Sequence, residues 1–384
     1  MYHILTNKSI SDGEILQGEG FLIDGGRIVD RGPIGELDAK GAEVLDLRGL
    51  TTMPGFVDIH AHGAMGFDVM DGTYEALDKI SAYKMKEGCT SFCPTTVTGP
   101  MDKTLAAVKN VKAAMDKGVS GAKIIGTFLE GPYINPRYKG AHPEEYILPI
   151  DLESIKKLIA AGEGSVVSII IAPELPGAVS AIETLVNMGV QVRLGHSAAT
   201  AGEAEAGVAA GANLCVHCYN AMSPLHHREP GMVGAVLTNH ALKAELICDL
   251  VHVHPDACKV LAQAKGSGGT VIVTDCMAAS GLADGKYKLG EITVQVTDGI
   301  SRMPDNTLAG STATMMACVC NMAEGVGVPL EEAVQMATAT PAQILGMYDK
   351  IGSLDLGKCA DIIGVDDDWG VRFVMIDGLV RQKM

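Results

Sequence analysis

The stretch VVSIIIAPELPGAVSAIETLVNMGVQVRLGH, residues 166–196, contains one complete unit of the repeat that decides the fold. Its apolar runs at 166–173 and 190–196 are continuous rather than alternating, which is typical of strands buried on both faces of a parallel sheet. Between the runs, apolar residues recur at helical spacing from Val179 onward, and Gly189 follows at a point where a left-handed residue can end a helix. The stretch therefore predicts a strand, a helix and a second strand parallel to the first.

The same theme recurs from residue 54 onward as a short β-branched run, a polar loop, an amphipathic segment and the next run. The runs are GFVDIH (55–60), CTSFCPTT (89–96), KIIGTFLE (123–130), VVSIIIAP (166–173), VQVRLGH (190–196), ANLCVHCYN (212–220), AELICDL (244–250) and TVIVTD (270–275). Eight strand–helix units in series are typical of a closed parallel barrel. The sequence therefore predicts an α/β fold, a (β/α)8 barrel of the TIM type over residues 54–347.

The two ends of the chain have a different pattern. Residues 1–53 hold short strand-like pieces separated by Gly and Asp turns, without helical periodicity, and residues 348–384 resume that pattern. Helices are expected around 312–322 and 330–346, just before the second end. Both termini are thus predicted to build one small β-sandwich domain, with the barrel inserted between them.

The composition bears on partners and on compartment. A formal net charge of −16 argues against nucleic acid or an anionic membrane as partner. No apolar run reaches the roughly 18 residues that span a bilayer, and no secretory signal is visible, so a cytoplasmic protein is expected. The ten cysteines are scattered, which fits reduced thiols. Cys215 and Cys218 flank His217 as a CxxC, but no second pair completes a structural zinc site.

Six side chains that can bind a metal follow the predicted strands closely. In such a barrel the active site lies at the carboxyl ends of the strands. These positions hold His60, His62, Glu130, His196, His217 and Asp275. A lone histidine or aspartate there is usually structural, but convergence at five strand ends favours a shared function. Imidazole and carboxylate suit zinc, iron, manganese or cobalt, and Asp275 is placed to take a proton from an activated water and return it.

Seven segments make a more specific pattern. They are PGFVDIHAHG (54–63), LEGPYINPRYKGAH (129–142), LGHSAAT (194–200), HCYNAMSPLHHREPG (217–231), HVHP (252–255), VTDCMAASGLADGKYKLG (273–290) and LAGSTATM (308–315). On these segments the chain resembles the N-acetylglucosamine-6-phosphate deacetylases of the amidohydrolase superfamily, over essentially its full length.

The resemblance implies roles for the strand-end residues. Glu130, His196 and His217 are implied to hold the principal divalent metal, with Asp275 as general base and then general acid. His142 is implied to stabilise the oxyanion, a role that usually supplies a large share of rate enhancement. The pair His60 and His62 is retained as in members with a second metal, which Glu130 would bridge. Whether that second position is filled stays open, so one or two ions per subunit are expected.

The resemblance also implies how an anionic substrate is held. Asn220, the Ala221 backbone N–H, Arg228 and His252 are the implied contacts for the sugar and its phosphate, and an arginine fork suits phosphate oxygens. The alternative for Arg228 is an ordinary surface ion pair with Glu229. Phosphate contacts from a neighbouring subunit in this family would fit a homodimer.

The implied reaction is hydrolysis of the acetamide of an N-acetylhexosamine 6-phosphate. Departures from the usual pattern at Cys218, Tyr219, Leu250 and Cys276 leave the choice between N-acetylglucosamine and its epimer N-acetylgalactosamine open. They also leave open whether Cys218 and Cys276 confer sensitivity to oxidation. Two further alternatives are hydrolysis of a cyclic amide or a deaminated base, and a catalytically dead structural protein. The phosphate-contact segment argues against the first, and the complete ligand set argues against the second.

Overall fold

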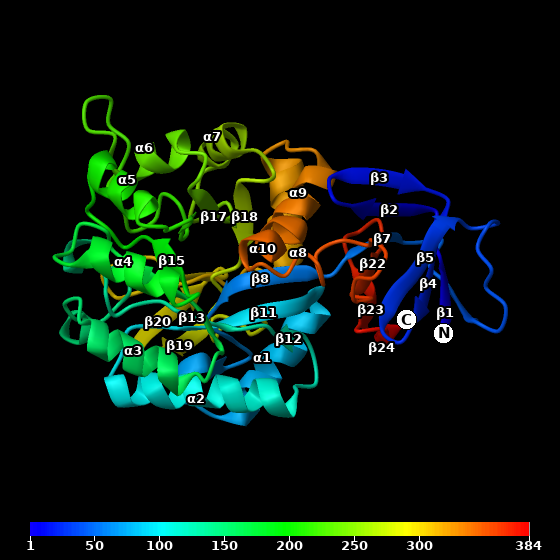
Figure 1. Cartoon of the computed structure of the whole chain (residues 1–384), viewed down its shortest axis with the longest axis horizontal. Coiled ribbons are helices and arrows are strands. Elements are labelled where there is room, and N and C mark those ends of the chain that lie inside the picture. Colours follow the sequence, from blue (N-terminus) through cyan, green and yellow to red (C-terminus); the bar gives the residue numbers. More distant parts are fainter. Residues whose placement is uncertain (384) are drawn as a thin grey trace.

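The eight apolar runs form the parallel strands of a nearly closed barrel in the computed structural model, which describes residues 1–383. The strands are β8 (Phe56–Ala61), β11 (Cys89–Thr96), β13 (Thr127–Leu129), β14 (Val166–Ile171), β15 (Gln191–Leu194), β16 (Leu214–Cys215), β17 (Lys243–Ile247) and β18 (Thr270–Val273), and β12 (Lys123–Ile124) extends the ladder on β11. Each strand pairs in parallel with the next one along the chain. The predicted barrel is therefore confirmed (Figure 1).

The seam between β8 and β18 is closed in another way. The backbone N–H of Asp275 donates to the carbonyl oxygen of His60 at 3.0 Å, and that of His62 donates to the Cys276 carbonyl oxygen at 2.8 Å. Deeper in the seam the Thr274 hydroxyl donates to the Asp58 carboxylate at 2.5 Å. These bonds join the first and last strands where the candidate residues lie.

Helices cover the outside of the barrel, as the apolar periodicity predicts. They are α1 (Tyr74–Lys86), α2 (Met101–Lys117), α3 (Leu152–Ala161), α4 (Ala178–Asn187), α5 (Ala201–Ala209), α6 (Gly231–Thr238), α7 (Pro255–Lys265), α8 (Met315–Cys320), α9 (Leu330–Ala337) and α10 (Ala339–Ile344). Local chemistry fixes their starts: the Thr200 side chain accepts the Glu203 N–H while Glu203 bonds back to Thr200, a capping box that begins α5.

The two chain ends form two further sheets. One has the order β5-β4-β1-β6, from β1 (Tyr2–Leu5), β4 (Glu19–Asp24), β5 (Arg27–Pro33) and β6 (Glu43–Asp46). The other has the order β24-β23-β22-β7-β2-β3, from β2 (Lys8–Ser11), β3 (Glu14–Gln17), β7 (Thr51–Pro54), β22 (Ile362–Val365), β23 (Val371–Ile376) and β24 (Leu379–Lys383). Strands from both termini thus meet within one sheet, and both ends of the chain lie together at the right of Figure 1.

The middle of this six-stranded sheet is buried on both faces, since all four residues of β22 are buried. Ile362 and Phe373 pack into a core shared with Ile4 and Phe21 of the other sheet. Ile363, on the opposite face, belongs to the large core of the barrel. The two sheets therefore pack as a sandwich that is continuous with the barrel, and the domain boundaries at 53/54 and 347/348 stay a prediction.

A three-stranded antiparallel sheet follows the eighth barrel strand and was not predicted. It consists of β19 (Gly285–Leu289), β20 (Ile292–Thr297) and β21 (Ile300–Arg302). The alternation of buried and exposed residues along β20 is the period-2 signal that could have revealed it. The main-chain N–H of Gly290 donates to the Asp68 carboxylate at 2.9 Å, which ties this sheet to the short strand β10 (Phe67–Asp68) that follows β8.

Among residues 1–383, no helix combines the length and the apolar character needed to cross a membrane.

Candidate active site

The six candidate metal ligands meet at the carboxyl ends of the barrel strands. Each follows or closes its strand within two residues, and each is at most 8% exposed. Three of them adopt left-handed backbone conformations, with φ of 44° at His196, 25° at His217 and 48° at Asp275. Such conformations cost a non-glycine residue free energy and cluster at functional sites.

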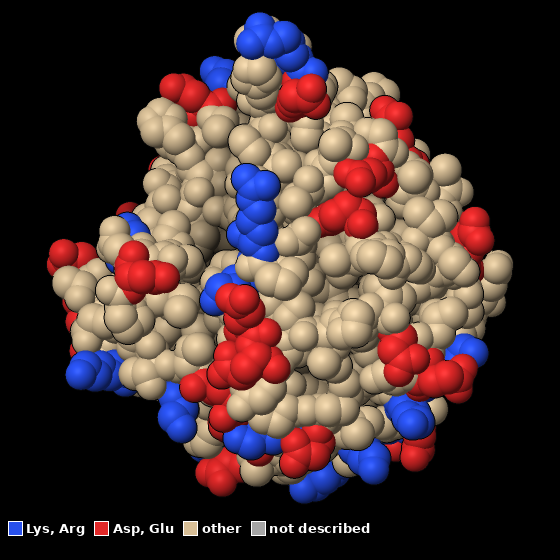
Figure 2. All heavy atoms as spheres, turned by 90° about the vertical axis from the view of Figure 1, so that its left-hand side faces the viewer, with Lys and Arg blue, Asp and Glu red and all other residues tan. Residues whose placement is uncertain are grey.

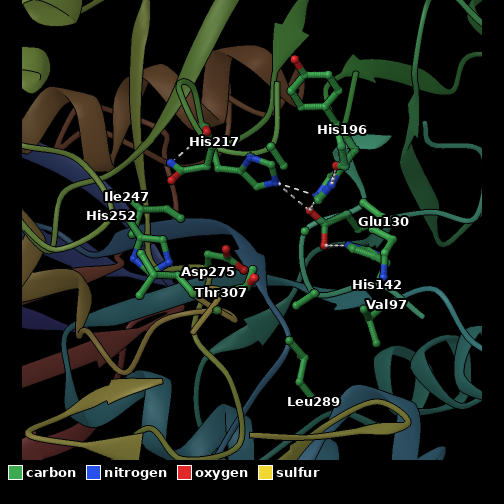
Figure 3. Close-up of a pocket in the computed structure, with 18 of the residues that line it drawn as sticks. Val97, Glu130, His142, His196, His217, Ile247, His252, Asp275, Leu289 and Thr307 are labelled. Carbon is green, nitrogen blue, oxygen red and sulfur yellow. Dashed lines mark hydrogen bonds and ion pairs between the residues drawn. The ribbon is translucent and has the colours of Figure 1, made fainter. Parts of the chain in front are cut away.

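Glu130 lies at the centre of the histidines. Its Oε1 atom is 3.0 Å from Nε2 of His217, and 3.4 Å from Nε2 of both His196 and His60. Its Oε2 atom is 3.1 Å from Nε2 of His62 and 3.5 Å from Nε2 of His142. Figure 3 shows Glu130 pointing toward His142, His196 and His217 across the cavity from Asp275. One carboxylate is thus placed to serve two neighbouring positions.

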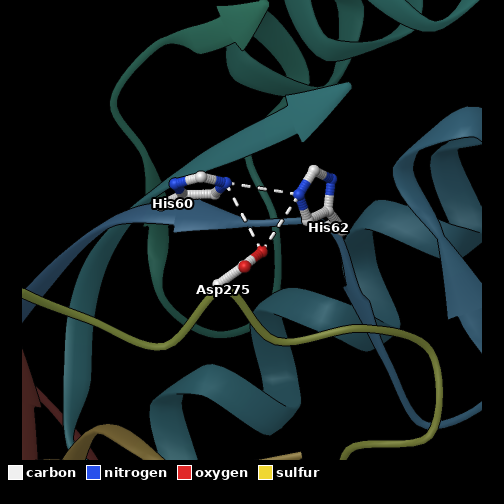
Figure 4. A group of neighbouring side chains, drawn as sticks. All are labelled: His60, His62 and Asp275. Carbon is white, nitrogen blue, oxygen red and sulfur yellow. Dashed lines mark hydrogen bonds and ion pairs between the residues drawn. The ribbon is translucent and has the colours of Figure 1, made fainter. Parts of the chain in front are cut away.

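Two groups of donors share this carboxylate. The first group is Glu130, His196 and His217, in which the two histidine Nε2 atoms are 3.1 Å apart. The second group is His60, His62 and Asp275, with 3.3 Å between the two Nε2 atoms. The Oδ1 atom of Asp275 is 3.4 Å from Nε2 of His60 and 3.2 Å from Nε2 of His62 (Figure 4). Each group has the donor spacing that surrounds a single ion.

Outer partners fix how three of these rings present their nitrogens. Nδ1 of His196 lies 2.8 Å from the Tyr138 carbonyl oxygen, Nδ1 of His62 3.2 Å from the Thr95 carbonyl oxygen, and Nδ1 of His60 2.9 Å from Oε2 of Glu245. These oxygens only accept, so each Nδ1 carries a proton and Nε2 is the nitrogen that remains to bind a metal ion. Histidine ligands of metals are oriented in this way.

His142 has the opposite arrangement. The backbone N–H of Thr98 donates to its Nδ1 at 3.3 Å, and the Thr98 hydroxyl lies 2.7 Å from the same atom. Because Nδ1 accepts, Nε2 carries the proton and faces the site as a donor. This suits a side chain that stabilises negative charge on a substrate oxygen.

The electrostatics favour a cation at this place. Burial opposes charge on Asp275, but the neighbouring His60 and His62 outweigh it and lower the pKa of Asp275 to about 2. Burial likewise opposes charge on His62, but Asp275 and Glu130 raise the pKa of His62 to about 9. Two carboxylates thus hold positive charge between them in the buried cluster. A divalent ion supplies that charge directly, and the nitrogen and oxygen donors fit zinc, iron, manganese or cobalt.

A cavity of about 640 Å³ opens onto the cluster. Of the predicted site residues, it is lined by His62, Glu130, His142, His196, His217, Asn220, Ala221, His252 and Asp275. His60 lies beneath it and is fully buried. Nδ1 of His252 is 2.7 Å from the Asp249 carboxylate, so its Nε2 is available to a ligand. The structure therefore brings together all the predicted site residues except one.

Arg228 is the exception. It lies exposed in the loop before α6 and does not line the cavity of its own chain. Its Nη1 is 2.7 Å from Nε2 of His227, and among residues 1–383 the expected alternative, an ion pair with Glu229, is not found. Within its own chain, Arg228 is therefore not part of the candidate site.

The residues that depart from the usual pattern also lie away from the cavity wall. Cys218, Tyr219, Leu250 and Cys276 are not among its lining residues. Both cysteines are fully buried, and burial raises the pKa of Cys276 to about 11. Burial of a thiol in apolar surroundings lowers its reactivity toward oxidants.

The profile of the amidohydrolase family matches residues 51–380. The chain belongs to the amidohydrolase family. An N-acetylgalactosamine-6-phosphate deacetylase of Escherichia coli O157:H7 is 40% identical over 98% of this chain and 99% of its own length. An N-acetylglucosamine-6-phosphate deacetylase of Vibrio furnissii is 41% identical over 88% of this chain and 85% of its own length.

Solved structures agree with this amidohydrolase assignment. A mutant of N-acetyl-D-glucosamine-6-phosphate deacetylase from Mycobacterium smegmatis, in complex with N-acetyl-D-glucosamine-6-phosphate, superposes with a TM-score of 0.94. It is 32% identical, and the match covers 100% of this chain and 99% of that one. Amidohydrolases of this family depend on a metal, and the donor groups around Glu130 and around Asp275 give this member the residues to bind one.

Three cationic residues of this amidohydrolase were missed by the sequence analysis. Arg137, Lys139 and Arg302 all line the cavity. The first two lie within the quoted segment 129–142, and the third lies on the unpredicted strand β21. Figure 2, which views the molecule from the left of Figure 1, shows basic side chains beside a hollow on this face, with acidic side chains around them. These residues supply the local positive charge that an anionic ligand of an acidic protein needs.

Proposed function

We propose that the chain hydrolyses the acetamide of N-acetylglucosamine 6-phosphate, giving glucosamine 6-phosphate and acetate. The observation that carries the proposal is the position of Glu130, whose two oxygens face five histidines at the floor of a cavity with cationic walls. The two relatives at 41% and 40% identity are hexosamine-6-phosphate deacetylases by name, which supports the same proposal.

The metal would be held as follows. Glu130, His196 and His217 are the ligands of the principal ion, and His60 and His62 form a second position that Glu130 bridges. Both proposals are supported by the Nε2 distances of 3.0 to 3.4 Å from the Glu130 carboxylate. A bound zinc, iron, manganese or cobalt ion would polarise the acetyl carbonyl and lower the pKa of a water molecule.

The chain's own groups would move the proton and bind the developing charge. Asp275 takes a proton from the attacking water as the oxygen bonds to the acetyl carbon. Nε2–H of His142 donates to the carbonyl oxygen as that oxygen becomes negative. When the C–N bond breaks, Asp275 returns the proton to the departing amine. The products are the amino sugar and acetic acid, which becomes acetate by releasing its remaining proton to the amine or to solvent, and Asp275 ends in its starting state.

The phosphorylated end of the substrate would lie against other residues of the cavity wall. Asn220, the backbone N–H of Ala221 and the Nε2 atom of His252 are the proposed contacts, and all three residues line the cavity. We assign Arg228 to the cavity of a second subunit, because it is exposed and absent from its own cavity. The active form would then be a homodimer.

The epimer is a second candidate substrate. The N-acetylgalactosamine-6-phosphate deacetylase of Escherichia coli O157:H7 matches nearly the full length of both chains, whereas the Vibrio furnissii relative covers 88% of this one. Their identities to this chain are almost equal. Sequence similarity therefore favours neither sugar strongly, and the assay has to include both.

The test is acetate release by the purified, metal-analysed protein. Four substrates are compared: N-acetylglucosamine and N-acetylgalactosamine, each with and without the 6-phosphate. We expect release from at least the glucosamine 6-phosphate form and little from either unphosphorylated sugar. Preference for the galactosamine 6-phosphate form would replace the first substrate by its epimer, and no release from either phosphate would refute the proposal.

A further inference from the structure

A buried ion pair lies inside the barrel beneath the metal-binding cluster. Arg193 of β15 and Glu245 of β17 are both fully buried. Nη1 of Arg193 donates to Oε1 of Glu245 at 2.5 Å and to the Ile59 carbonyl oxygen at 3.1 Å. The guanidinium lies over the ring of Phe128, 3.8 Å from its centroid. Burying two charges in this way is costly, so the pair needs a reason beyond filling space.

The second oxygen of Glu245 faces the candidate ligands. Oε2 is 2.9 Å from Nδ1 of His60 and accepts the backbone N–H of His217 at 3.3 Å. Glu245 therefore uses one oxygen to bind Arg193 and the other to contact a residue of each donor group. Arg193 in turn bonds the carbonyl of Ile59, the residue next to His60.

This contact determines what His60 can do. Glu245 is the partner of His60 Nδ1 among the described residues, and a carboxylate at that atom keeps the proton on Nδ1. Nε2 is then the nitrogen that remains to bind an ion, and it points at the space between Nε2 of His62 and Oδ1 of Asp275. The Phe128 ring lies edge-on to the His60 ring with 5.0 Å between centroids and limits its rotation. The ring is thus fixed in both tautomer and direction.

We propose that the Arg193–Glu245 pair is the positioning device that makes His60 a metal ligand, so that a second ion at His60, His62 and Asp275 depends on it. The inference deepens the proposed function, because it assumes that this cluster binds metal. It names two residues that control the occupancy of the second position without touching the ion or the substrate.

The test measures metal binding rather than activity. Metal-free protein is titrated with zinc, and the ions bound per chain are counted by elemental analysis after gel filtration. We expect two ions in the wild-type protein. In Glu245→Gln the first ion should bind as before, while the second binds about 10- to 100-fold more weakly, the usual effect of removing an outer partner of a ligand. Nitrogen NMR of His60 should show the Nδ1–H tautomer in the wild type and a mixture in the variant.

Two further variants keep the test decisive. Arg193→Met/Glu245→Leu removes both charges, which buried pairs often tolerate, so it serves if Glu245→Gln does not fold. It should retain one ion and lose the second. Asp361→Asn is the matched control, because it breaks a pair with Lys123 at 2.8 Å in which Asp361 is buried, away from the cluster. It should bind two ions.

The outcomes separate the two proposals. Wild-type protein that binds a single ion, or Glu245 variants that bind two ions with wild-type affinity, would overturn the inference about the pair. Acetate release is measured on the same preparations. Glu245-dependent binding of two ions without acetate release from any hexosamine 6-phosphate would refute the deacetylase proposal and leave the role of the pair standing.

Discussion

The Oε1 atom of Glu130 lies 3.0 Å from Nε2 of His217, although 87 positions separate the two residues in the chain. The contact exists because β13 and β16 end at the same edge of the barrel, and both residues follow those ends. Removing either side chain takes away one of the three proposed ligands of the principal ion. The predictions below concern what this edge of the barrel does.

Asp275 is expected to be essential for turnover but not for folding. Asp275→Asn keeps the size and most contacts of the side chain but cannot take up a proton. We expect kcat to fall about 10³-fold, the usual worth of a positioned general base, with the principal ion retained. Steady-state acetate release and metal analysis check both parts. A variant with substantial turnover would refute the role of Asp275.

His142 is expected to act as a hydrogen-bond donor to the substrate carbonyl. Since Thr98 fixes its tautomer, His142→Gln should lower kcat about 10²- to 10³-fold and leave KM and metal content nearly unchanged. Thr98→Val keeps the backbone N–H and removes only the hydroxyl, so its loss should be much smaller. An equal fall in kcat in the two variants would mean that His142 acts through packing and not as a hydrogen-bond donor.

Arg228 is expected to serve the neighbouring subunit. Arg228→Ala should raise KM for the phosphorylated sugar about 10- to 100-fold, the range expected when a charged hydrogen bond is lost. Mixing Arg228→Ala and Asp275→Asn subunits should then restore activity, because one site of the mixed dimer has both residues. If Arg228 acted within its own chain, mixing would restore nothing.

Arg302 is the control for Arg228, because it lines the cavity of its own chain. Arg302→Ala should also raise KM for the phosphorylated sugar, but mixing it with Asp275→Asn should bring no recovery. The same assay therefore distinguishes the two arginines by the subunit in which they act. Recovery with Arg302→Ala would contradict its placement.

Lys84 is expected to be critical for stability. Its Nζ is 2.7 Å from the Asp58 carboxylate and also bonds Glu87, and all three side chains are buried. Lys84→Met leaves two buried carboxylates without a cation, which should cost about 3–5 kcal/mol in the free energy of unfolding. Lys103→Met, which breaks an exposed pair with Glu291, should cost no more than about 1 kcal/mol. Denaturant titration of both variants checks the difference.

Asp68 gives the stability a defined dependence on pH. Burial raises its pKa from 3.8 to about 6, although the N–H groups of Gly290 and Met70 bond its carboxylate and oppose the shift. The folded state therefore holds this proton more tightly than the unfolded state. The resulting stabilisation is complete below pH 3.8 and is lost as the pH rises through about 6. The full loss in the free energy of unfolding is about 3 kcal/mol. Metal-free Asp68→Asn should lack this loss of stability. The free energy of unfolding of both metal-free proteins is measured between about pH 4 and 7, and the same dependence on pH in both would contradict the assignment.

Much of this architecture could be predicted from the sequence because its cause is local. Continuous β-branched runs such as 166–171 are typical of buried strands, and parallel strands bring their carboxyl ends to one edge. Polar residues at those ends, such as Glu130 and Asp275, could therefore be assigned to one site from the sequence.

Other features depend on contacts that no local pattern records. Arg193 and Glu245 lie within apolar runs and were read simply as parts of strands, although a charge inside a buried run was a signal of a buried pair. The left-handed backbone of His196 is imposed by the site and not by residue type. Arg302 reaches the cavity from β21, a strand of three residues that is too short to show a period of its own.

The central claim is that acetamide hydrolysis depends on an ion held at Glu130, His196 and His217. The most direct test is acetate release from N-acetylglucosamine 6-phosphate and its epimer by protein stripped with a chelator, confirmed metal-free and then reloaded with zinc, iron, manganese or cobalt. We predict that stripped wild-type protein is inactive and regains its rate on reloading with at least one of these ions, whereas Glu130→Gln stays inactive under every condition. Undiminished acetate release by the metal-free wild-type protein would contradict the account.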